Sequence, residues 1–354
     1  MSGGVDSSVA AALLVRQGYD CVGVTMKLFE DGADLPDRPC CSLDATSDAR
    51  RVAERLGIPH YVLNMVDHFG RDVIADFVAE YAAGRTPIPC VRCNTFTKFS
   101  DLVAKADAID AGFVATGHYA RVAGGALHRG ADDAKDQSYF LWGIDRAVLP
   151  RLKLPVGEMT KAETRAIARE LDLPRVADKP ESQEICFVPD GDYVQILRRE
   201  LPADAPALVP GPIVTTSGAV IGEHEGFARY TIGQRKGLPG GSSDPLYVVA
   251  LRPATREVVV GPREALARMQ VALRQVNWLA GPSTEASLDV EVRLRSSSRL
   301  LPATVRLHEP GGTVTLHEPE YGVAPGQACV FYRGDRVLGG GWIEASLARP
   351  QNPN

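Results

Sequence analysis

Apolar positions in the first half of the chain follow two spacings, and each spacing predicts a different kind of element. Helical spacing, with apolar residues recurring every three or four positions, covers residues 6–18, 46–56, 73–81 and 98–111. Between these helices, a short apolar run predicts a buried strand at residues 21–26, and further strands are expected at residues 60–65 and 112–122. Strands that alternate with helices predict a doubly wound parallel sheet with helices on both faces. Ligands bind to such sheets at the carboxyl ends of the strands.

The second half of the chain changes to the alternating pattern of β-strands. A last helix begins with a capping box at Thr160, and a proline-rich stretch over residues 201–212 predicts a domain boundary. Beyond this boundary, strands are expected at residues 213–222 (as a hairpin), 246–251, 257–261, 288–295, 303–309, 312–318 and 328–334. We therefore expect an α/β domain over residues 1–200, followed by two small β-rich domains over residues 201–272 and 273–354.

The composition limits the class of protein. Of the 354 residues, 45% are hydrophobic and 23% are charged, which is typical of a globular protein. No apolar run is long enough to span a membrane and no signal peptide opens the sequence, so we expect a cytoplasmic protein without a membrane partner. The net charge of −5 argues against a protein covered with nucleic-acid-binding charge, although local basic clusters can still bind phosphates. Seven cysteines without an export signal favour reduced thiols over a disulfide scaffold.

The first eight residues, MSGGVDSS, are the strongest candidate for chemistry. Gly3 and Gly4 have no side chains, so successive backbone N–H groups can converge on an anion. Asp6, Ser7 and Ser8 suit a helix start, and the N-terminus of a helix attracts phosphate through its amides and its dipole. The lysine of an ordinary P-loop is absent. A Gly/Ser turn that merely begins an ordinary helix is the alternative interpretation.

A second candidate site is a set of three cysteines. Cys90 and Cys93 lie in the loop TPIPCVRCN, and Cys186 lies far along the chain in ESQEICFVPDG. A structural zinc site needs four ligands, so another cysteine or a histidine would have to join these three. Buried, inert cysteines are expected inside strands, as at Cys21 and Cys329. Because a proline-rich loop is an unusual place for an inert cysteine, redox or sulfur-transfer chemistry is favoured for the set.

The sequence motifs resemble those of a known enzyme family. MSGGVDSS matches the pyrophosphate loop of ATP pyrophosphatases, the PP-loop superfamily, which split ATP into AMP and pyrophosphate while they adenylate a substrate oxygen. The chain as a whole is similar to the bacterial tRNA-specific 2-thiouridylases, which install sulfur at C2 of the wobble uridine in certain tRNAs. The matching blocks follow in the family's order from Met1 to Gly341: MSGGVDSSVAA, TPIPCVRCN with Lys98 and Phe99, ATGHYAR, KDQSYFLW, ICF, GFARYTIGQRKGL and PGQACVFY.

The chemistry of that reaction suits the residues present. The C2 carbonyl of uridine is a poor electrophile, and its oxygen cannot leave as oxide. Adenylation by ATP turns the oxygen into part of AMP, a good leaving group, while the glycine-rich loop and Mg²⁺ stabilise the departing pyrophosphate. A sulfur nucleophile then attacks the activated carbon, so one difficult step is replaced by easier ones.

The resemblance implies a role for each matching residue. Cys186 carries a persulfide that receives sulfur from a cysteine desulfurase or a sulfur-relay protein. Cys93 attacks or helps to release that sulfur and can form a disulfide with Cys186. The implied ATP-binding residues are Met1, Ser2, Gly3, Gly4, Val5, Asp6, Ser7, Met26 and Gly117. The implied tRNA contacts are His118, Lys135, Asp136, Gln137, Arg295, Ser296 and Gln327, with Ile88, Pro89 and Cys90 against the target base. The implied substrates are the tRNAs for lysine, glutamate and glutamine.

The sequence departs from the family pattern at Cys90. Many members carry an aspartate there, three residues before the first active cysteine, and this chain therefore lacks a carboxylate that could act as a general base. Related RNA-thiolating enzymes use three cysteines to hold a [4Fe–4S] cluster with one iron open for sulfur. We therefore include a [4Fe–4S] cluster on Cys90, Cys93 and Cys186 among the hypotheses, beside a persulfide on Cys186 with Cys90 as a spare thiol.

The position of the loop at Met1 is unexpected. In a sheet of this class a phosphate loop follows a central strand, and the numbering begins without one. Either the gene start has been placed too late, which we expect, or this chain lacks a strand that its family has. A sheet without its central strand leaves apolar faces and backbone groups unpaired, so the chain as numbered is expected to be less stable and to bind ATP less well than a longer version.

Other functions remain as alternatives. Another PP-loop enzyme, such as a 2-thiocytidine or 4-thiouridine tRNA thiolase, a lysidine synthetase or an amide-forming synthetase, would share the loop. From a different class, a non-catalytic RNA-binding relative would keep the tRNA contacts without the reaction. Without the family, His118 reads as a hydrogen-bonded residue at a strand end, and Lys135–Gln137 as an ordinary polar turn.

Overall fold

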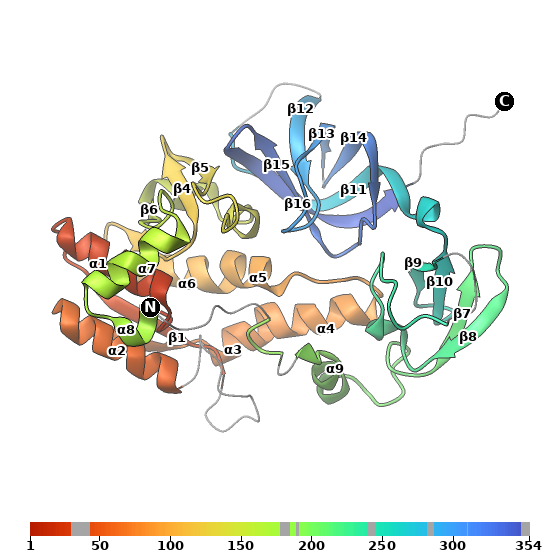
Figure 1. Cartoon of the computed structure of the whole chain (residues 1–354), viewed down its shortest axis with the longest axis horizontal. Helices are drawn as coiled ribbons and strands as arrows, with labels where there is room; N and C mark the ends of the chain where they lie inside the picture. The colour runs from red at the N-terminus through yellow and green to blue at the C-terminus, as the bar shows by residue number, and fades with distance from the viewer. Residues whose placement is uncertain are drawn as a thin grey trace. The chain divides into compact units, whose positions relative to one another are not determined.

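The computed structural model describes residues 1–29, 43–177, 185–188, 191–239, 245–281, 287–309 and 311–347 (Figure 1). The chain divides into two compact units. The N-terminal unit comprises Met1–Val73, Cys90–Asp192 and Asp335–Val337. The β-rich unit comprises Ile74–Pro89, Tyr193–Gly334 and Leu338–Asn354. One helix-bearing segment, Ile74–Pro89, therefore belongs to the β-rich unit although it lies early in the sequence.

Two parallel strand pairs lie in the N-terminal unit, as the alternation of strands and helices predicts. Strand β1 (Gly23–Lys27) pairs with β2 (His60–Asn64) in parallel, with Met26 opposite Leu63. Strand β3 (Val114–Ala115) pairs with β6 (Leu152–Lys153), also in parallel. The loops at the carboxyl ends of these strands are the expected place for a ligand.

The prediction of a single strand over residues 112–122 is wrong. The structure has β3 and then a separate strand, β4 (Ala120–Ala123), which pairs antiparallel with β5 (Ala126–Arg129). The chain leaves the β3 ladder because Gly117 packs against the backbone of residues 6 and 7, and the Tyr119 hydroxyl donates to Asp6 at 2.8 Å. Tertiary contacts with the N-terminal loop thus interrupt a continuous β-pattern.

Helices supply the rest of the described N-terminal unit. The α-helices are α1 (Val5–Arg16), α2 (Leu43–Leu56), α3 (Val66–Phe69), α5 (Pro89–Arg92, which begins at the unit boundary), α6 (Phe99–Ala108), α7 (Lys161–Glu170) and α8 (Pro174–Ala177). Two π-helical segments, η1 (Gly70–Ile74) and η2 (Cys93–Lys98), and the 3₁₀ segments η3 (Ser138–Phe140) and η4 (Arg146–Arg151) complete it. Buried apolar side chains of α1, α2, α7 and α8 form one core, which includes Val9, Val52, Ala168 and Val176.

The helix ends test the capping predictions. The predicted capping box of α7 is confirmed: Thr160 Oγ1 accepts from the Glu163 amide, and a Glu163 carboxylate oxygen accepts from the Thr160 amide at 2.7 Å. The predicted start of α2 at residues 46–48 is wrong, because the helix already includes Leu43. Asp48 lies inside it, buried and 3.4 Å from Arg51, so its carboxylate supports an ion pair instead of a cap.

A closed barrel dominates the β-rich unit (Figure 1). Its strands follow the order β11–β14–β13–β12–β15–β16, and β11 also pairs with β16. Alternating side chains of these strands fill the interior, including Val292, Phe331 and Ile343, each fully buried. The strands are β11 (Ala267–Trp278), β12 (Leu288–Arg293), β13 (Leu301–His308), β14 (Gly311–Tyr321), β15 (Ala328–Arg333) and β16 (Arg336–Leu347).

A smaller sheet and two helices complete the β-rich unit. The sheet has the order β8–β7–β10–β9, and the expected hairpin is confirmed as antiparallel β7 and β8. Helix α4 packs against α9, where the rings of Tyr81 and Tyr193 stack 4.5 Å apart. The bounds are α4 (Ala75–Ala82), α9 (Val194–Glu200), β7 (Gly211–Thr215), β8 (Val220–His224), η6 (Phe227–Arg229), β9 (Tyr247–Arg252), β10 (Glu257–Gly261) and η7 (Arg263–Leu266).

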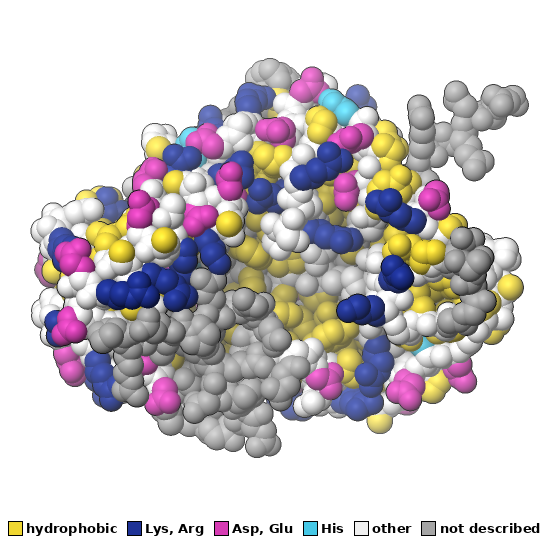
Figure 2. All heavy atoms as spheres, viewed as in Figure 1, with side chains coloured by type: hydrophobic (Ala, Val, Ile, Leu, Met, Phe, Trp, Pro, Cys, Tyr) yellow, Lys and Arg dark blue, Asp and Glu magenta, His cyan; other side chains and the backbone are white. Residues whose placement is uncertain are grey.

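The surface is mixed in charge, in keeping with a net charge of −5. Figure 2 shows Lys and Arg side chains interspersed with Asp and Glu over the visible face. Among the described residues, no helix combines the length and the apolar character that a membrane crossing requires.

Candidate functional site

Short-range hydrogen bonds shape the loop before α1. The Ser2 amide donates to Ser7 Oγ at 3.1 Å, and the Ser7 hydroxyl donates to the Gly4 carbonyl at 3.2 Å. The Ser8 hydroxyl reaches the same carbonyl at 2.8 Å. The helix begins at Val5, with Gly4 as the N-cap, and no described side chain caps it. The first-turn amides and the positive end of the helix dipole therefore remain suited to an anion.

Two glycines allow this loop to pack closely. Gly3 has φ of +65°, and a Cβ at this position would lie 2.2 Å from the Ala45 carbonyl oxygen. A Cβ on Gly117 would lie 2.5 Å from the Ser7 amide nitrogen. Both positions therefore require glycine. The structure thus brings Gly117, predicted from a distant motif to bind the nucleotide, directly against the phosphate loop.

Asp6 is the charged centre of the site. Lys161 Nζ lies 2.7 and 2.9 Å from its two carboxylate oxygens, and the Tyr119 hydroxyl donates to one of them at 2.8 Å. Tyr119 also contacts Thr164, 3.0 Å away, on the same helix as Lys161. The first turn of α7 therefore supplies a cation at the loop, where an ordinary P-loop would have its own lysine.

A second cation acts on the surroundings of the loop. Burial and the positive charge of Lys98 lower the pKa of His118 to about 3, and its Nδ1 lies 2.8 Å from Thr116 Oγ1. His118 is therefore a neutral, hydrogen-bonded residue at pH 7. The positive charge of Lys98 therefore acts on His118, which follows Gly117 in the chain.

The cysteine motif lies on a helical segment that changes from α-helical to π-helical geometry at Cys93. Cys90 is exposed on the short helix α5, and the half-buried Cys93 begins the π-helical segment η2. Asn94 is buried, and its side-chain amide donates to the Phe140 carbonyl at 3.0 Å. This bond ties η2 to the KDQSYFLW block. π-Helical segments are often found at functional sites, and here one begins at the residue predicted to be catalytic.

The described residues do not form the ligand set that an iron–sulfur cluster needs. Cys186 is half-buried in the described stretch 185–188, next to Phe187, whose ring packs 5.6 Å from that of Phe69. Within the described part of the chain, no group of three or more Cys, His, Asp or Glu side chains could hold a metal ion. The donor set of Cys90, Cys93 and Cys186 therefore does not fit a cluster in this arrangement.

The buried-strand interpretation holds for one cysteine and fails for another. Cys329 is fully buried in β15, and burial raises the pKa of its thiol well above the usual range. The prediction that Cys21 lies inside a strand is wrong, because Cys21 is half-buried and precedes β1. Burial still raises the pKa of Cys21, with Asp20 adding to the effect.

Side chains predicted to touch tRNA also make internal bonds. Asp136 accepts hydrogen bonds from the amides of Gly130 and Ser138, at 3.1 and 3.0 Å. Gln137 Oε1 accepts from the Tyr119 amide at 2.9 Å. Because Tyr119 in turn bonds Asp6, the polar turn supports the phosphate loop. Contact of Lys135, Asp136, Gln137 and His118 with tRNA stays a prediction.

Within the β-rich unit, the two basic segments predicted from the sequence are neighbours. The Arg295 guanidinium donates to the Gly322 carbonyl, and a Cβ on Gly233 would lie 3.5 Å from Arg295 Nη2. Gly233 belongs to the loop that carries Arg235 and Lys236, which line a pocket of about 600 Å³. Ser296 is exposed beside Arg295. Positive charge from two distant segments is thus gathered in one region, as a phosphate-binding surface requires.

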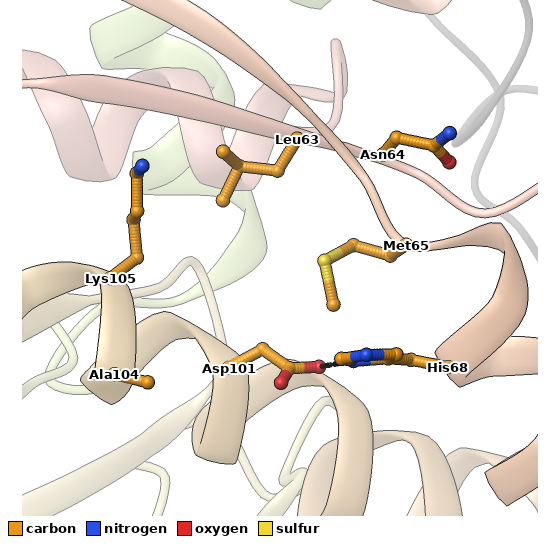
Figure 3. Close-up of a pocket in the computed structure, with 7 residues that line it drawn as sticks. All are labelled: Leu63, Asn64, Met65, His68, Asp101, Ala104 and Lys105. Atoms are coloured by element: carbon orange, nitrogen blue, oxygen red, sulfur yellow. Dashed lines mark hydrogen bonds and ion pairs between the residues drawn. The ribbon is translucent and has the colours of Figure 1, made fainter.

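A shallow pocket lies at the carboxyl end of β2 (Figure 3). It has a volume of about 320 Å³ and is lined by Leu63, Asn64, Met65, His68, Asp101, Ala104 and Lys105. His68 Nδ1 lies 3.0 Å from Asp101 Oδ2 across it. It is separate from the predicted site residues, none of which lines it.

The sequence analysis missed three residues that build the site: Lys161, Tyr119 and Lys98. A signal existed for Lys161, because it occupies the first position of α7, where the helix dipole disfavours a cation. Such a placement indicates a nearby anion. Tyr119 and Lys98 lie inside the quoted motifs, but only the fold shows that they approach the loop.

Comparison with known proteins covers nearly the whole chain. Residues 1–190 match the family model described as the tRNA methyl transferase HUP domain. Residues 199–262 match the corresponding PRC-barrel domain, and residues 268–343 match the aminomethyltransferase beta-barrel domain. The HUP and barrel descriptions agree with the α/β class and the barrel seen here.

Curated relatives carry one name. The tRNA-specific 2-thiouridylase MnmA of Rhodospirillum centenum is 54% identical, over 99% of this chain and 92% of that protein. The proteins of that name from Paracoccus denitrificans and Methylobacterium radiotolerans are 51% and 50% identical, over 97% and 99% of this chain and 90% and 94% of their own lengths. Among solved structures, an NMN synthetase from Francisella tularensis aligns with a TM-score of 0.34 and 19% identity, over 51% of this chain and 64% of that one.

Proposed function

We propose that this chain, which belongs to the family of tRNA-specific 2-thiouridylases, uses ATP to replace the C2 oxygen of the wobble uridine in tRNA by sulfur. The observation that carries the proposal is the loop before α1, with Lys161 against Asp6 and Gly117 against the Ser7 amide. This arrangement suits a nucleotide whose pyrophosphate leaves, and it lies in a chain that also carries the family's two cysteines.

In the first step, the C2 oxygen of uridine attacks the α-phosphorus of ATP and pyrophosphate leaves. The first-turn amides of α1 and the hydroxyls of Ser2 and Ser7 would bind the departing phosphates. Lys161 and Lys98 would balance their negative charge. Met26, at the carboxyl end of β1, would line the nucleotide site. Mg²⁺ supplies further charge neutralisation when bound, and Asp6 would hold it together with the phosphates, since Mg²⁺ is usually bound by one or two carboxylates and the substrate.

In the second step, sulfur replaces the adenylated oxygen. A persulfide on Cys186 would provide the outer sulfur atom, which attacks C2 and displaces AMP. The Cys93 thiolate would then attack the Cys186 sulfur, which breaks the S–S bond, releases 2-thiouridine and leaves a Cys93–Cys186 disulfide. External thiols must reduce that disulfide before the next turnover. A cysteine desulfurase or a sulfur-relay protein would reload Cys186.

The substrate would be held partly by the β-rich unit. Arg295, Arg235 and Lys236 gather positive charge there, which suits the phosphates of RNA. Ile88 and Pro89 are buried and Cys90 is exposed, so Cys90 is the accessible member of the group proposed to lie against the target base. We expect the tRNAs for lysine, glutamate and glutamine to be the substrates.

The test incubates the protein with tRNA, ATP and a persulfide donor, then analyses nucleosides and nucleotides by mass spectrometry. We expect 2-thiouridine, AMP and pyrophosphate. Accumulation of ADP and phosphate would contradict the adenylation step, and methylated uridine formed from S-adenosylmethionine would support the name of the family model instead. In a parallel reaction, Cys186→Ser should abolish 2-thiouridine formation while tRNA affinity stays near that of the wild type, because only the sulfur carrier is lost.

A further inference from the structure

Three arginines in the segment RLRSSSR have different surroundings in the β-rich unit. Arg293 is buried at the end of β12. Arg299 is exposed, and its guanidinium pairs with Glu318 at 2.7 Å. Arg295, between them, donates to the Gly322 carbonyl and forms no ion pair with any described residue. Of these three arginines, Arg295 therefore keeps a positive charge that an anionic ligand can use.

A loop shaped by Gln234 presents two more cations, Arg235 and Lys236, which are both exposed. Gln234 Oε1 accepts from the Thr231 amide at 3.1 Å, and Gln234 Nε2 donates to the Lys236 carbonyl at 2.9 Å. The Gln234 carbonyl also accepts from the Val248 amide of β9 at 2.9 Å. Neither cation forms an ion pair within the described part of the chain. The loop therefore holds both charges on a preorganised backbone.

An exposed aromatic ring adjoins these charges. Tyr321, the last residue of β14, is 37% exposed, and the Arg263 guanidinium lies over its ring, 4.7 Å from the centroid. The next residue is Gly322, whose carbonyl accepts from Arg295. A Cβ on Gly233, in the cationic loop, would lie 3.6 Å from the Gly322 Cα. The ring, the two arginines and the loop therefore form one continuous surface within the β-rich unit.

The backbone fixes both partners of the Arg263–Tyr321 stack. Arg268 donates to the carbonyls of Ala265 and Ala267, at 2.8 and 2.9 Å, and so shapes the turn that carries Arg263. Ala267 is paired with Tyr321 in the β11–β14 ladder. Arg263 is exposed and has no ion-pair partner among the described residues. Its position over the ring is therefore a cation–π contact and not the by-product of a salt bridge.

Aromatic rings and guanidinium planes are the groups on which unpaired bases of RNA stack. We propose that Tyr321 and Arg263 form a platform on which an unpaired base of the tRNA stacks. Arg235, Lys236 and Arg295 bind the phosphates beside that base. The proposal rests on the proposed function, which makes tRNA the substrate. Of these five residues, the sequence resemblance implies a tRNA contact only for Arg295.

The main test replaces Tyr321 by leucine and measures the Kd for tRNA by fluorescence anisotropy, without ATP or a sulfur donor. We expect the Kd to rise about tenfold, the size expected for the loss of one stacked base. Tyr321→Phe keeps the ring and should bind within about twofold of the wild type. Tyr321→Leu should also weaken binding of a short single-stranded oligouridine, but not of an RNA duplex of the same length, whose bases are already stacked.

Salt dependence separates stacking from charge. Tyr321→Leu should keep the slope of log Kd against log salt concentration, whereas Lys236→Met should reduce that slope by about one, the share of one phosphate contact. Arg263→Met should raise the Kd for tRNA at least about threefold, because the ring loses its cationic partner. Arg299→Met is the matched control, since it removes the same charge from an exposed pair with Glu318 in the same barrel. Its Kd should stay within about twofold of the wild type.

A wild-type Kd for tRNA in both Tyr321→Leu and Arg263→Met would overturn the proposal. Should Tyr321→Leu fail to fold by circular dichroism, the Arg263 and Arg299 variants decide the question. If both platform variants bind tRNA normally but lose an affinity for oligoglutamate that the wild type has, the surface fits an acidic protein, which also overturns the proposal. A wild-type protein that forms no 2-thiouridine would contradict the proposed function, whereas the binding comparison needs no turnover and still tests the platform.

Discussion

The loop before α1 and the segment that precedes the cysteines are held in opposite ways. Ser2, Ser7 and Ser8 bond to one another and to Gly4 within eight residues of sequence. The segment before the cysteines is instead held by Gln327, 241 positions away from Thr86, and by Arg274, 194 positions away from Glu80. The comparison teaches that the loop before α1 carries much of its shape in its own sequence. The segment Ile74–Pro89, by contrast, depends on partners from distant parts of the β-rich unit.

The comparison has one important exception on the loop side. Gly3, Asp6 and Ser7 each touch a residue from elsewhere in the N-terminal unit, namely Ala45, Lys161 and Gly117. These contacts determine how tightly the loop is closed and where its charge lies. The predictions that follow test the loop contacts first and the cysteine motif last, in order of decreasing effect.

Among the substitutions tested at neutral pH, Gly3→Ala should have the largest effect. The added Cβ would meet the Ala45 carbonyl oxygen at 2.2 Å, in backbone that already has φ of +65°. We expect a loss of about 2–4 kcal/mol in the free energy of unfolding, since steric overlap and a disfavoured φ combine. ATP-dependent pyrophosphate release should fall with it. Gly18→Ala is the control, because Gly18 has φ of +82° but no atom within 4 Å of the added Cβ. Equal denaturation midpoints for the two variants would contradict the account.

Lys161→Met should weaken ATP use more than stability. It removes the cation that lies 2.7 Å from Asp6, so the loop would meet the phosphates with an uncompensated carboxylate. We expect the KM for ATP to rise about tenfold, as for the loss of a partly buried charged contact. Steady-state pyrophosphate release measures it. Arg16→Met, which breaks an exposed pair with Glu170, is the control. An unchanged KM would mean that Lys161 only holds Asp6 in place.

His118 should make stability depend on pH. Its pKa is lowered to about 3 in the folded state, whereas an unfolded histidine titrates near 6.5. Between these values the unfolded chain binds a proton that the folded chain does not. The free energy of unfolding should therefore fall as the pH drops from 6.5 towards 3, by on the order of 4 kcal/mol in total.

His118→Gln should flatten this decline, and urea denaturation at several pH values measures it. His308→Gln, at an exposed position of β13, should keep the wild-type slope. An equally steep decline in His118→Gln would show that other groups cause the acid sensitivity.

Cys90→Asp should have the smallest effect on activity. It tests whether Cys90 has a role in the cysteine motif beyond that of an exposed side chain. Because Cys90 is exposed and belongs to no metal-binding group among the described residues, we expect thiolation within about threefold of the wild type, typical of a surface change. Anaerobically prepared protein is examined by absorbance near about 400 nm, where cysteine-ligated clusters absorb. Loss of such absorbance together with activity in the variant would revive the iron–sulfur hypothesis.

Much of the fold follows from patterns that act over short distances. The first helix, the capping box at Thr160, the strands β1 and β2 and the hairpin of β7 and β8 were all predicted from spacing and turn residues. In the helix, its capping box and the hairpin, the hydrogen bonds join residues a few positions apart. The strands β1 and β2 were recognised from their own apolar runs, although Gly23 pairs with the distant His60.

The tertiary structure alone decided the features that depend on distant partners. Two strands replace the single strand predicted over residues 112–122, because Gly117 packs against the loop before α1 and Tyr119 bonds to Asp6 in the first turn of α1. The tertiary structure also placed Ile74–Pro89 in the β-rich unit and gave Gln327 a backbone partner. The sequence by itself determined many of the elements and the family, through local order and matching motifs. Which side chains meet across the chain depends on how buried surfaces pack, and no local pattern encodes that choice.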